Sequence, residues 1–173
     1  MWIQTYTGKK FYFSDPRVDQ INLVDIAHGL SLQCRFAGQC DVFYSVAEHC
    51  VRMVNWRLPG DAKIQLLHDA AEAYLSDIPT PIKRILPEFQ ALEDSILKAI
   101  FYKYGLNILD LGTIKEADKI MCVTEQRDIM KPPLDKWEGD YPEPYPVKII
   151  PWTSQKAEHQ FLVAAIDLGF DYL

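Results

Sequence analysis

Hydrophobic residues recur at helical spacing through most of the chain. In the stretch 24–32, for example, Val24, Ile26, Ala27, Leu30 and Leu32 follow the period of a helix. The same kind of pattern predicts further helices at about 46–56, 62–74, 88–104, 114–130 and 154–168. Residues that favour helix N-termini precede several of them: Asp19 or Asn22, Ser45, Asp61, and Thr153 or Ser154. Ser45 with Glu48 and Thr113 with Glu116 have the spacing of capping boxes. The sequence therefore predicts an all-α helical bundle.

Two segments do not follow this pattern. Residues 1–16 alternate loosely around Thr7-Gly8-Lys9-Lys10 and are rich in β-favouring bulk, which predicts a short N-terminal β-hairpin. Residues 131–152 combine repeated prolines with tryptophan and tyrosine, so they cannot form a regular helix. We expect this Pro- and aromatic-rich loop to be either a packed lid or a contact in a homo-oligomer.

Length and charge narrow the class of protein. The 173 residues suit one domain, 1–173. The formal net charge of −6 argues against a broad nucleic-acid surface, but not against a small anionic substrate. The N-terminus lacks signal-peptide character, and no apolar run approaches transmembrane length, so we expect a cytoplasmic protein that does not enter the membrane. The four scattered cysteines are expected to be reduced and buried.

The chemistry-bearing residues centre on His68, Asp69 and Glu72, which can project toward one side of a helix. An imidazole beside a carboxylate suits a borderline divalent ion such as Mn, Fe, Co, Ni or Zn. Of the other histidines, His49 is the strongest candidate for a further ligand, because it lies in a well-capped helix. Asp118, in a later helix, is a candidate for the fourth.

The order of these residues resembles the HD-domain phosphohydrolases, helical enzymes that hold a divalent metal with a His, His-Asp, Asp quartet. The resemblance is strongest to their 5'-deoxynucleotidase branch and to the related phage deoxynucleoside triphosphohydrolases of the dATP type. Their pattern H, then HD-x-x-E-x-x-x-x-D-[IL]-P-T-P-[IV]-K, is met without a break by His49, His68-Asp69, Glu72 and Asp77-Ile78-Pro79-Thr80-Pro81-Ile82-Lys83. The resemblance implies an HD-domain bundle in which His49, His68, Asp69 and Asp118 bind one divalent transition metal.

The resemblance also implies roles for residues around the metal. Glu72 and Asp77 would handle protons, and Lys83 would meet a phosphate. Arg35-Phe36 resembles the pair that binds phosphate and packs on the nucleoside, with Phe where the best-known members have Trp. Gly38 is expected near the base pocket, and additional Mg²⁺ is expected on the substrate phosphates.

The function that follows is metal-dependent hydrolysis of a phosphoester in a (deoxy)ribonucleotide. The substrate is either a monophosphate, which would release phosphate, or a triphosphate, which would release tripolyphosphate. A guanosine-alarmone hydrolase is an alternative, although those enzymes usually carry Asp where this chain has Ala73. The remaining alternative is a non-catalytic nucleotide-binding sensor.

Overall fold

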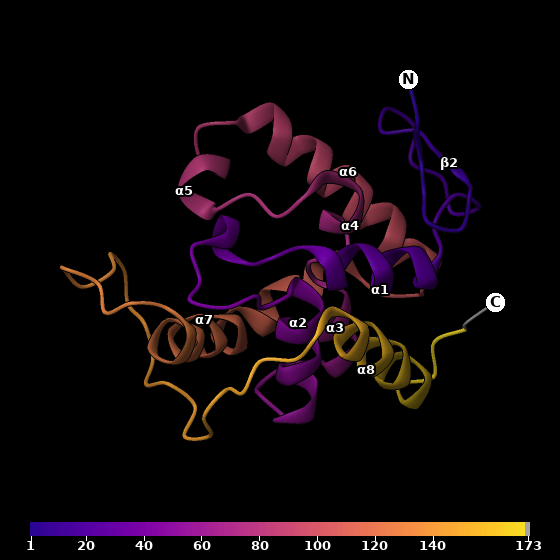
Figure 1. The fold of residues 1–173 in the computed structure, drawn as a ribbon. Coiled ribbons are helices and arrows are strands. Elements are labelled where there is room, and N and C mark those ends of the chain that lie inside the picture. The colour runs from indigo at the N-terminus through magenta and orange to yellow at the C-terminus, as the bar shows by residue number, and fades with distance from the viewer. Residues whose placement is uncertain (172–173) are drawn as a thin grey trace.

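The computed structural model describes residues 1–171 as a mostly helical protein with a small N-terminal hairpin (Figure 1). The last two residues of the predicted domain, 172–173, lie outside the described residues. The elements are β1 (Ile3–Gln4), β2 (Lys10–Phe11), α1 (Leu23–Leu32), η1 (Phe36–Gly38), α2 (Val46–Asn55), α3 (Ala62–Leu67), α4 (Glu72–Leu75), α5 (Thr80–Lys83), α6 (Pro87–Lys103), η2 (Ile108–Ile114), α7 (Lys115–Ile129) and α8 (Ser154–Asp167). The strands pair antiparallel, with Ile3 opposite Phe11. The predicted all-α class and the hairpin are both confirmed.

Helix α2 is at the centre of the structure. It packs against α1, α3, α7 and α8, and all its residues from Val46 to Met53 are buried (Figure 1). A helix enclosed in this way must bury its polar residues as well, and each of them then needs a partner. Glu48 and Arg52 satisfy each other, since Arg52 Nε and Nη2 donate to Glu48 Oε1 over 2.8 and 2.6 Å.

Side chains cap most of the long helices as the sequence predicts. Asn22, not Asp19, accepts from the Val24 N–H at the start of α1. Ser45, Asp61 and Thr153 cap α2, α3 and α8.

Both predicted capping boxes are wrong. The Glu48 carboxylate does not return to its cap residue, because it binds Arg52 and accepts from the Trp152 N–H. Thr113 donates its hydroxyl hydrogen to the Asp110 carbonyl instead of capping, and α7 begins with no side-chain cap.

The single helix predicted for 62–74 is also wrong, because the structure divides it into α3 and α4. Between them the backbone tightens into successive turns, in which Ala70 N–H donates to Leu67 O and Glu72 N–H to Asp69 O. His68 and Asp69, the two residues on which the predicted site depends, lie in these turns between the two helices.

The Pro- and aromatic-rich segment 131–152 has no helix or strand and lies against its own chain. Its second half is fixed by hydrogen bonds from Tyr145 N–H to Thr124 Oγ1, from Ile149 N–H to the Asp128 carboxylate and from Arg52 to Ile150 O. Its first half passes beside α7. The predicted homo-oligomer and cytoplasmic location stay predictions.

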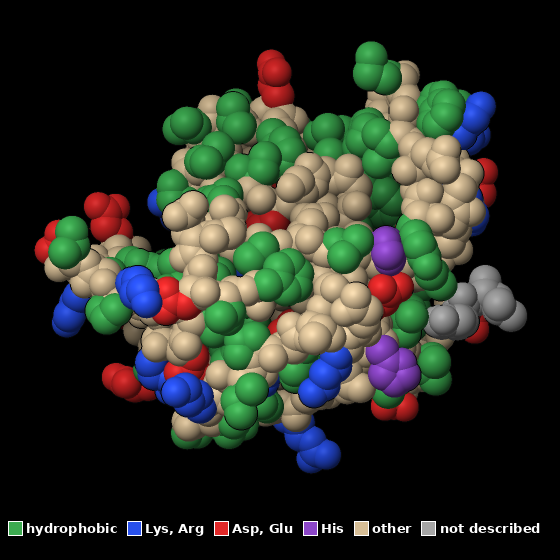
Figure 2. Space-filling view, in the orientation of Figure 1, with side chains coloured by type: hydrophobic (Ala, Val, Ile, Leu, Met, Phe, Trp, Pro, Cys, Tyr) green, Lys and Arg blue, Asp and Glu red, His purple; other side chains and the backbone are tan. Residues whose placement is uncertain are grey.

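Two surface properties of the fold concern possible partners. Hydrophobic side chains gather over α5 and the start of α6 (Figure 2), where Ile82, Ile85 and Leu86 are exposed. Within residues 1–171, no helix has both the length and the apolar character needed to cross a membrane.

The buried ion pair in α2 provides a test of the fold. Replacing Arg52 with Leu leaves the Glu48 carboxylate buried without its counter-charge, and we expect a loss of about 3–5 kcal/mol in unfolding free energy. Urea denaturation followed by circular dichroism would measure it. The control is Lys131→Ala, which breaks an ion pair with Asp41 in which the lysine side chain is 84% exposed, and which should cost at most about 1 kcal/mol. Equal, small losses in both variants would contradict the assignment.

Candidate metal centre

Two imidazole rings are oriented so that their Nε2 atoms face a common space. His49, fully buried on α2, has its Nδ1 2.6 Å from Glu125 Oε1 of α7. His68, at the end of α3, has its Nδ1 2.8 Å from the Gln65 carbonyl oxygen. Each Nδ1 therefore donates, and both Nε2 atoms are buried without any hydrogen-bond partner. Buried ring nitrogens without a hydrogen-bond partner are rare and need an explanation. Histidines that bind a metal through Nε2 usually donate from Nδ1 to a carboxylate or a carbonyl, as both of these do.

Carboxylates complete the same cluster. His49 Nε2 is 3.3 Å from Asp118 Oδ1 and 4.0 Å from Asp69 Oδ2, and His68 Nε2 is 3.2 Å from Asp69 Oδ2. Ligand atoms that share a metal at bond lengths of about 2.0–2.2 Å lie roughly 3–4 Å apart. Ligand atoms of His49, His68 and Asp118 all lie within 4.8 Å of one another and could hold a divalent metal. Asp69, the fourth predicted ligand, contacts both imidazole Nε2 atoms from beside this group.

A second group, Cys50 with His68 and Asp69, fits a metal less well. Cys50 Sγ approaches His68 on Nδ1, at 4.0 Å, and that nitrogen already donates to Gln65 O. Burial raises the pKa of the Cys50 thiol to about 11, which disfavours the thiolate that a metal requires. All four cysteines are free, as predicted; Cys50 is buried, whereas Cys34, Cys40 and Cys122 are only half-buried, so the prediction of burial is wrong for these three.

A cavity of about 690 Å³ opens beside the cluster. Its polar lining comprises six of the predicted site residues: Arg35, Asp69, Glu72, Asp77, Lys83 and Asp118. Phe36 also lines it, as expected for a residue that contacts substrate. Gly38 does not line it, but its neighbours Ala37 and Gln39 do, so the expected place of Gly38 near a base pocket stays a prediction. Gly38 has φ of +77°, a backbone conformation that glycine adopts without strain.

The amino-acid sequence is similar to that of two uncharacterized bacterial proteins. No family model matches it. It is 44% identical over 129 residues to YfdR of Escherichia coli, an uncharacterized protein; the match covers 74% of this chain and 72% of YfdR. The chain belongs to the YfdR family. A second uncharacterized relative, RCAP_rcc00048 of Rhodobacter capsulatus, is 33% identical over 133 residues, which cover 68% of this YfdR-family chain and 65% of the relative.

Glu72 is held in an unusual state beside the cluster. Its Oε1 accepts from Lys83 Nζ at 2.8 Å, whereas its Oε2 is buried without a partner. Burial raises the pKa of Glu72 well above its ordinary value; Asp69 and Asp77 add to the rise and Lys83 opposes it. Burial also raises the pKa of Asp77, and the negative charge of Asp69 raises it further. A raised pKa favours the protonated form of a carboxyl group, which is the form that can donate a proton.

The charges within the cluster act in the opposite direction on Asp69. Burial alone would raise its pKa, but the neighbouring His68, His49 and Arg35 outweigh burial and hold the pKa well below the usual range. For His68 the signs are reversed: burial alone would lower its pKa, but the neighbouring Asp69 carboxylate outweighs burial and raises the pKa above its usual value. Asp69 is therefore ionised, which is the form in which a carboxylate binds a metal.

The loop that carries Arg35 and Phe36 has a strained backbone. Phe36 and Ala37 adopt φ of +56° and +52°, in the left-handed region that non-glycine residues rarely occupy. Arg35 donates from Nε to Glu125 Oε2 at 3.0 Å, and its Nη1 lies 3.6 Å from Asp69 Oδ2. Strain of this kind clusters at functional sites, and here it accompanies an arginine and an aromatic ring that both face the cavity.

Three residues of the site were missed from the sequence. Glu125 links His49 to Arg35, and its position seven residues after Asp118, on the same face of α7, was the available signal. Glu93 of α6 holds Lys83 at 2.7 Å, and Trp137 lines the cavity. The sequence carries no local signal for Glu93, which tertiary packing brings in. Trp137 belongs to the segment predicted as a lid or an oligomer contact, but the sequence did not place it at the cavity.

Glu125 tests how the site orients its histidine. Glu125→Gln should weaken binding of Co²⁺ or Mn²⁺ by about 10- to 100-fold, because the amide fixes the His49 ring less firmly and removes a negative charge. Isothermal titration of chelator-treated, folded protein would measure this. Cys50→Ser is the control and should leave the affinity unchanged. If the two variants behaved in the reverse way, the Cys50 group would be the metal site.

Proposed function

We propose that this YfdR-family chain is an HD-type, metal-dependent phosphohydrolase that cleaves a phosphoester in a deoxyribonucleotide or ribonucleotide. The observation that carries the proposal is the pair of buried, unpartnered Nε2 atoms of His49 and His68, which face Asp69 and Asp118 beside a large cavity. The unbroken match from His68 to Lys83 supports the same assignment.

The size and lining of the cavity suit a nucleotide. A volume of about 690 Å³ lies in the range of small-molecule sites. Acidic, basic and aromatic side chains all line this cavity, among them Asp69, Arg35 and Phe36. A nucleotide needs both basic and aromatic side chains, because its phosphate is anionic and its base is planar and apolar.

His49, His68, Asp69 and Asp118 would hold the metal. A divalent ion held there would supply a Lewis acid for a phosphoryl oxygen and would acidify a neighbouring water. Arg35 binds the phosphate with the N–H groups that Glu125 leaves free. Lys83 adds positive charge at the same side of the cavity, while its own position is fixed by Glu72 and Glu93.

Glu72 and Asp77 transfer the protons of the reaction. One carboxylate accepts a proton from the attacking water, and the other acid donates one to the leaving oxygen. Glu72 is suited to this work because Lys83 fixes one oxygen and leaves Oε2 without a partner. Monophosphates, which would release phosphate, and triphosphates, which would release tripolyphosphate with Mg²⁺ on their phosphates, are both candidate substrates.

Glu72→Gln tests this assignment. We expect it to retain bound metal and to lower kcat by about 10²- to 10⁴-fold, because the amide cannot exchange the proton. The assay incubates the Mn²⁺-, Co²⁺- or Zn²⁺-loaded protein with a panel of deoxynucleoside mono- and triphosphates and identifies the products.

The matched control is Glu158→Gln, the same change at a residue of α8 that pairs with His28 outside the cavity. It should keep wild-type turnover. Full turnover by Glu72→Gln would remove Glu72 from the chemistry. A panel on which the metal-loaded wild type releases neither phosphate nor tripolyphosphate would overturn the proposed function.

A further inference from the structure

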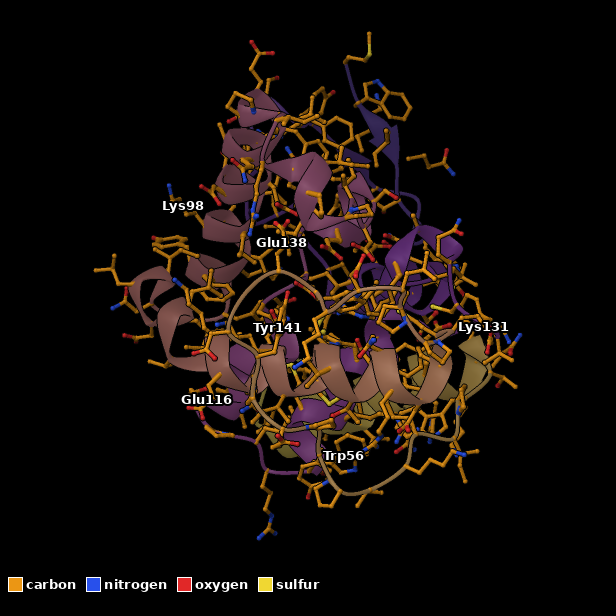
Figure 3. The ribbon with its side chains drawn as sticks, turned by 90° about the vertical axis from the view of Figure 1, so that its left-hand side faces the viewer. Trp56, Lys98, Glu116, Lys131, Glu138 and Tyr141 are labelled. Atoms are coloured by element: carbon orange, nitrogen blue, oxygen red, sulfur yellow. The ribbon has the colours of Figure 1, made fainter. Side chains whose placement is uncertain are left out.

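The first part of the Pro- and aromatic-rich segment, residues 131–141, forms one wall of the large cavity. Trp137, Glu138 and Tyr141 line it together with Arg35 and Asp118. Figure 3 shows the loop that carries Glu138 and Tyr141 running alongside α7. A segment distant in sequence from the metal cluster therefore borders the same space, and nothing in the proposed chemistry assigns it a role.

Trp137 meets Phe36 across this wall. Their ring centroids are 6.1 Å apart and the ring planes are inclined by 51°, so the rings touch without stacking. Arg35 lies over the Phe36 ring, and its guanidinium carbon is 5.2 Å from the centroid of that ring. Two aromatic rings thus stand beside the group proposed to bind phosphate, at the position where the base of a bound nucleotide would lie.

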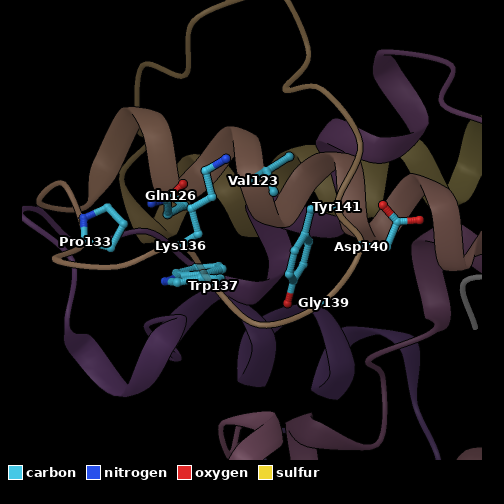
Figure 4. A pocket seen from close by; sticks show the side chains of 8 residues that line it. All are labelled: Val123, Gln126, Pro133, Lys136, Trp137, Gly139, Asp140 and Tyr141. Atoms are coloured by element: carbon cyan, nitrogen blue, oxygen red, sulfur yellow. The ribbon is translucent and has the colours of Figure 1, made fainter.

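A second cavity, of about 330 Å³, also borders Trp137. It lies between the loop and α7, and Trp137, Tyr141 and Val123 line it (Figure 4). Trp137 therefore lines both cavities, and its side chain is only partly buried. Its closest aromatic neighbour within the loop is Tyr141, whose ring lies at 6.1 Å in an edge-on arrangement.

The loop is attached to the rest of the protein near its two ends. Lys131 Nζ contacts Asp41 Oδ2 at 3.0 Å, and Lys119 Nζ donates to the Asp140 carbonyl at 2.8 Å. Gly139 has φ of +127°, a conformation that allows a sharp bend next to Trp137. Among the described residues, no hydrogen bond holds 132–139 to the rest of the chain, so this part can move while its ends stay fixed.

We propose that Trp137 is a substrate-binding residue: the 131–141 loop is a lid, and Trp137 and Phe36 part to receive and stack on the base of a nucleotide. The lid thus selects ligands with a planar base over bare sugar phosphates. Stacking on aromatic rings tolerates any base, because every base has a flat π-face. The inference rests on the proposed function only in taking the ligand to be a nucleotide.

Binding to metal-loaded Glu72→Gln protein tests the lid without turnover. The probes are deoxynucleoside 5'-monophosphates, with 2-deoxyribose 5-phosphate as the base-free control. We expect nucleotides to quench tryptophan fluorescence and the sugar phosphate to leave it unchanged. Adding Trp137→Phe should abolish the quench, and Trp56→Phe should keep it, because Trp56 stacks on Tyr145 away from the cavity.

Calorimetry supplies the second readout. Trp137→Ala should weaken nucleotide binding by about tenfold or more and leave sugar-phosphate binding unchanged. In the otherwise wild-type enzyme, the same variant should raise KM by that factor, with little change in kcat. Trp137→Phe should recover most of the affinity, since it restores an aromatic face.

The outcomes separate the two proposals. Hydrolysis of nucleotides with unchanged KM in Trp137→Ala would overturn the lid and leave the proposed function standing. Nucleotide binding that depends on Trp137, without hydrolysis by the wild type, would support the lid and overturn the phosphohydrolase. Absence of any nucleotide binding would overturn the lid as well.

Discussion

The Glu125 carboxylate is the interaction on which the site depends. With one oxygen it binds His49 Nδ1, and with the other it accepts from Arg35 Nε. Both contacts lie in a dry interior, since His49 and Glu125 are fully buried, so each is stronger than it would be in water and costly to lose. One residue of α7 thus contacts both an imidazole of α2, the proposed ligand His49, and Arg35 of the 33–39 loop.

That arrangement requires α2 to be the centre of the fold. A helix enclosed by α1, α3, α7 and α8 can present His49 to a buried cluster only if its other charged residues are satisfied. Glu48 does this together with Arg52 and also accepts from the Trp152 N–H, which fixes the end of the 131–152 segment. The stability of the core and the position of the segment that borders the cavity are thereby connected through one helix.

Local sequence signals predicted the long helices and the hairpin, and the resemblance to the HD-domain phosphohydrolases pointed to several of the residues around the cavity. They did not predict the break between α3 and α4, because residues 62–74 all have acceptable helical propensity. The break is set by tertiary packing: α4 lies on α1, where a side chain on Gly29 would come within 2.9 Å of the Ala73 carbonyl oxygen. Glu93 and the place of Trp137 at the cavity were missed for the same reason, because tertiary packing brings both to the site.

The central claim is that His49, His68, Asp69 and Asp118 bind one metal. Anomalous X-ray diffraction from crystals of Mn²⁺- or Co²⁺-loaded protein tests it most directly. The account predicts a single strong peak at about 2.0–2.3 Å from both Nε2 atoms and from an oxygen of each aspartate. A peak bonded to Cys50, or loaded protein with no peak between the two imidazoles, would contradict it.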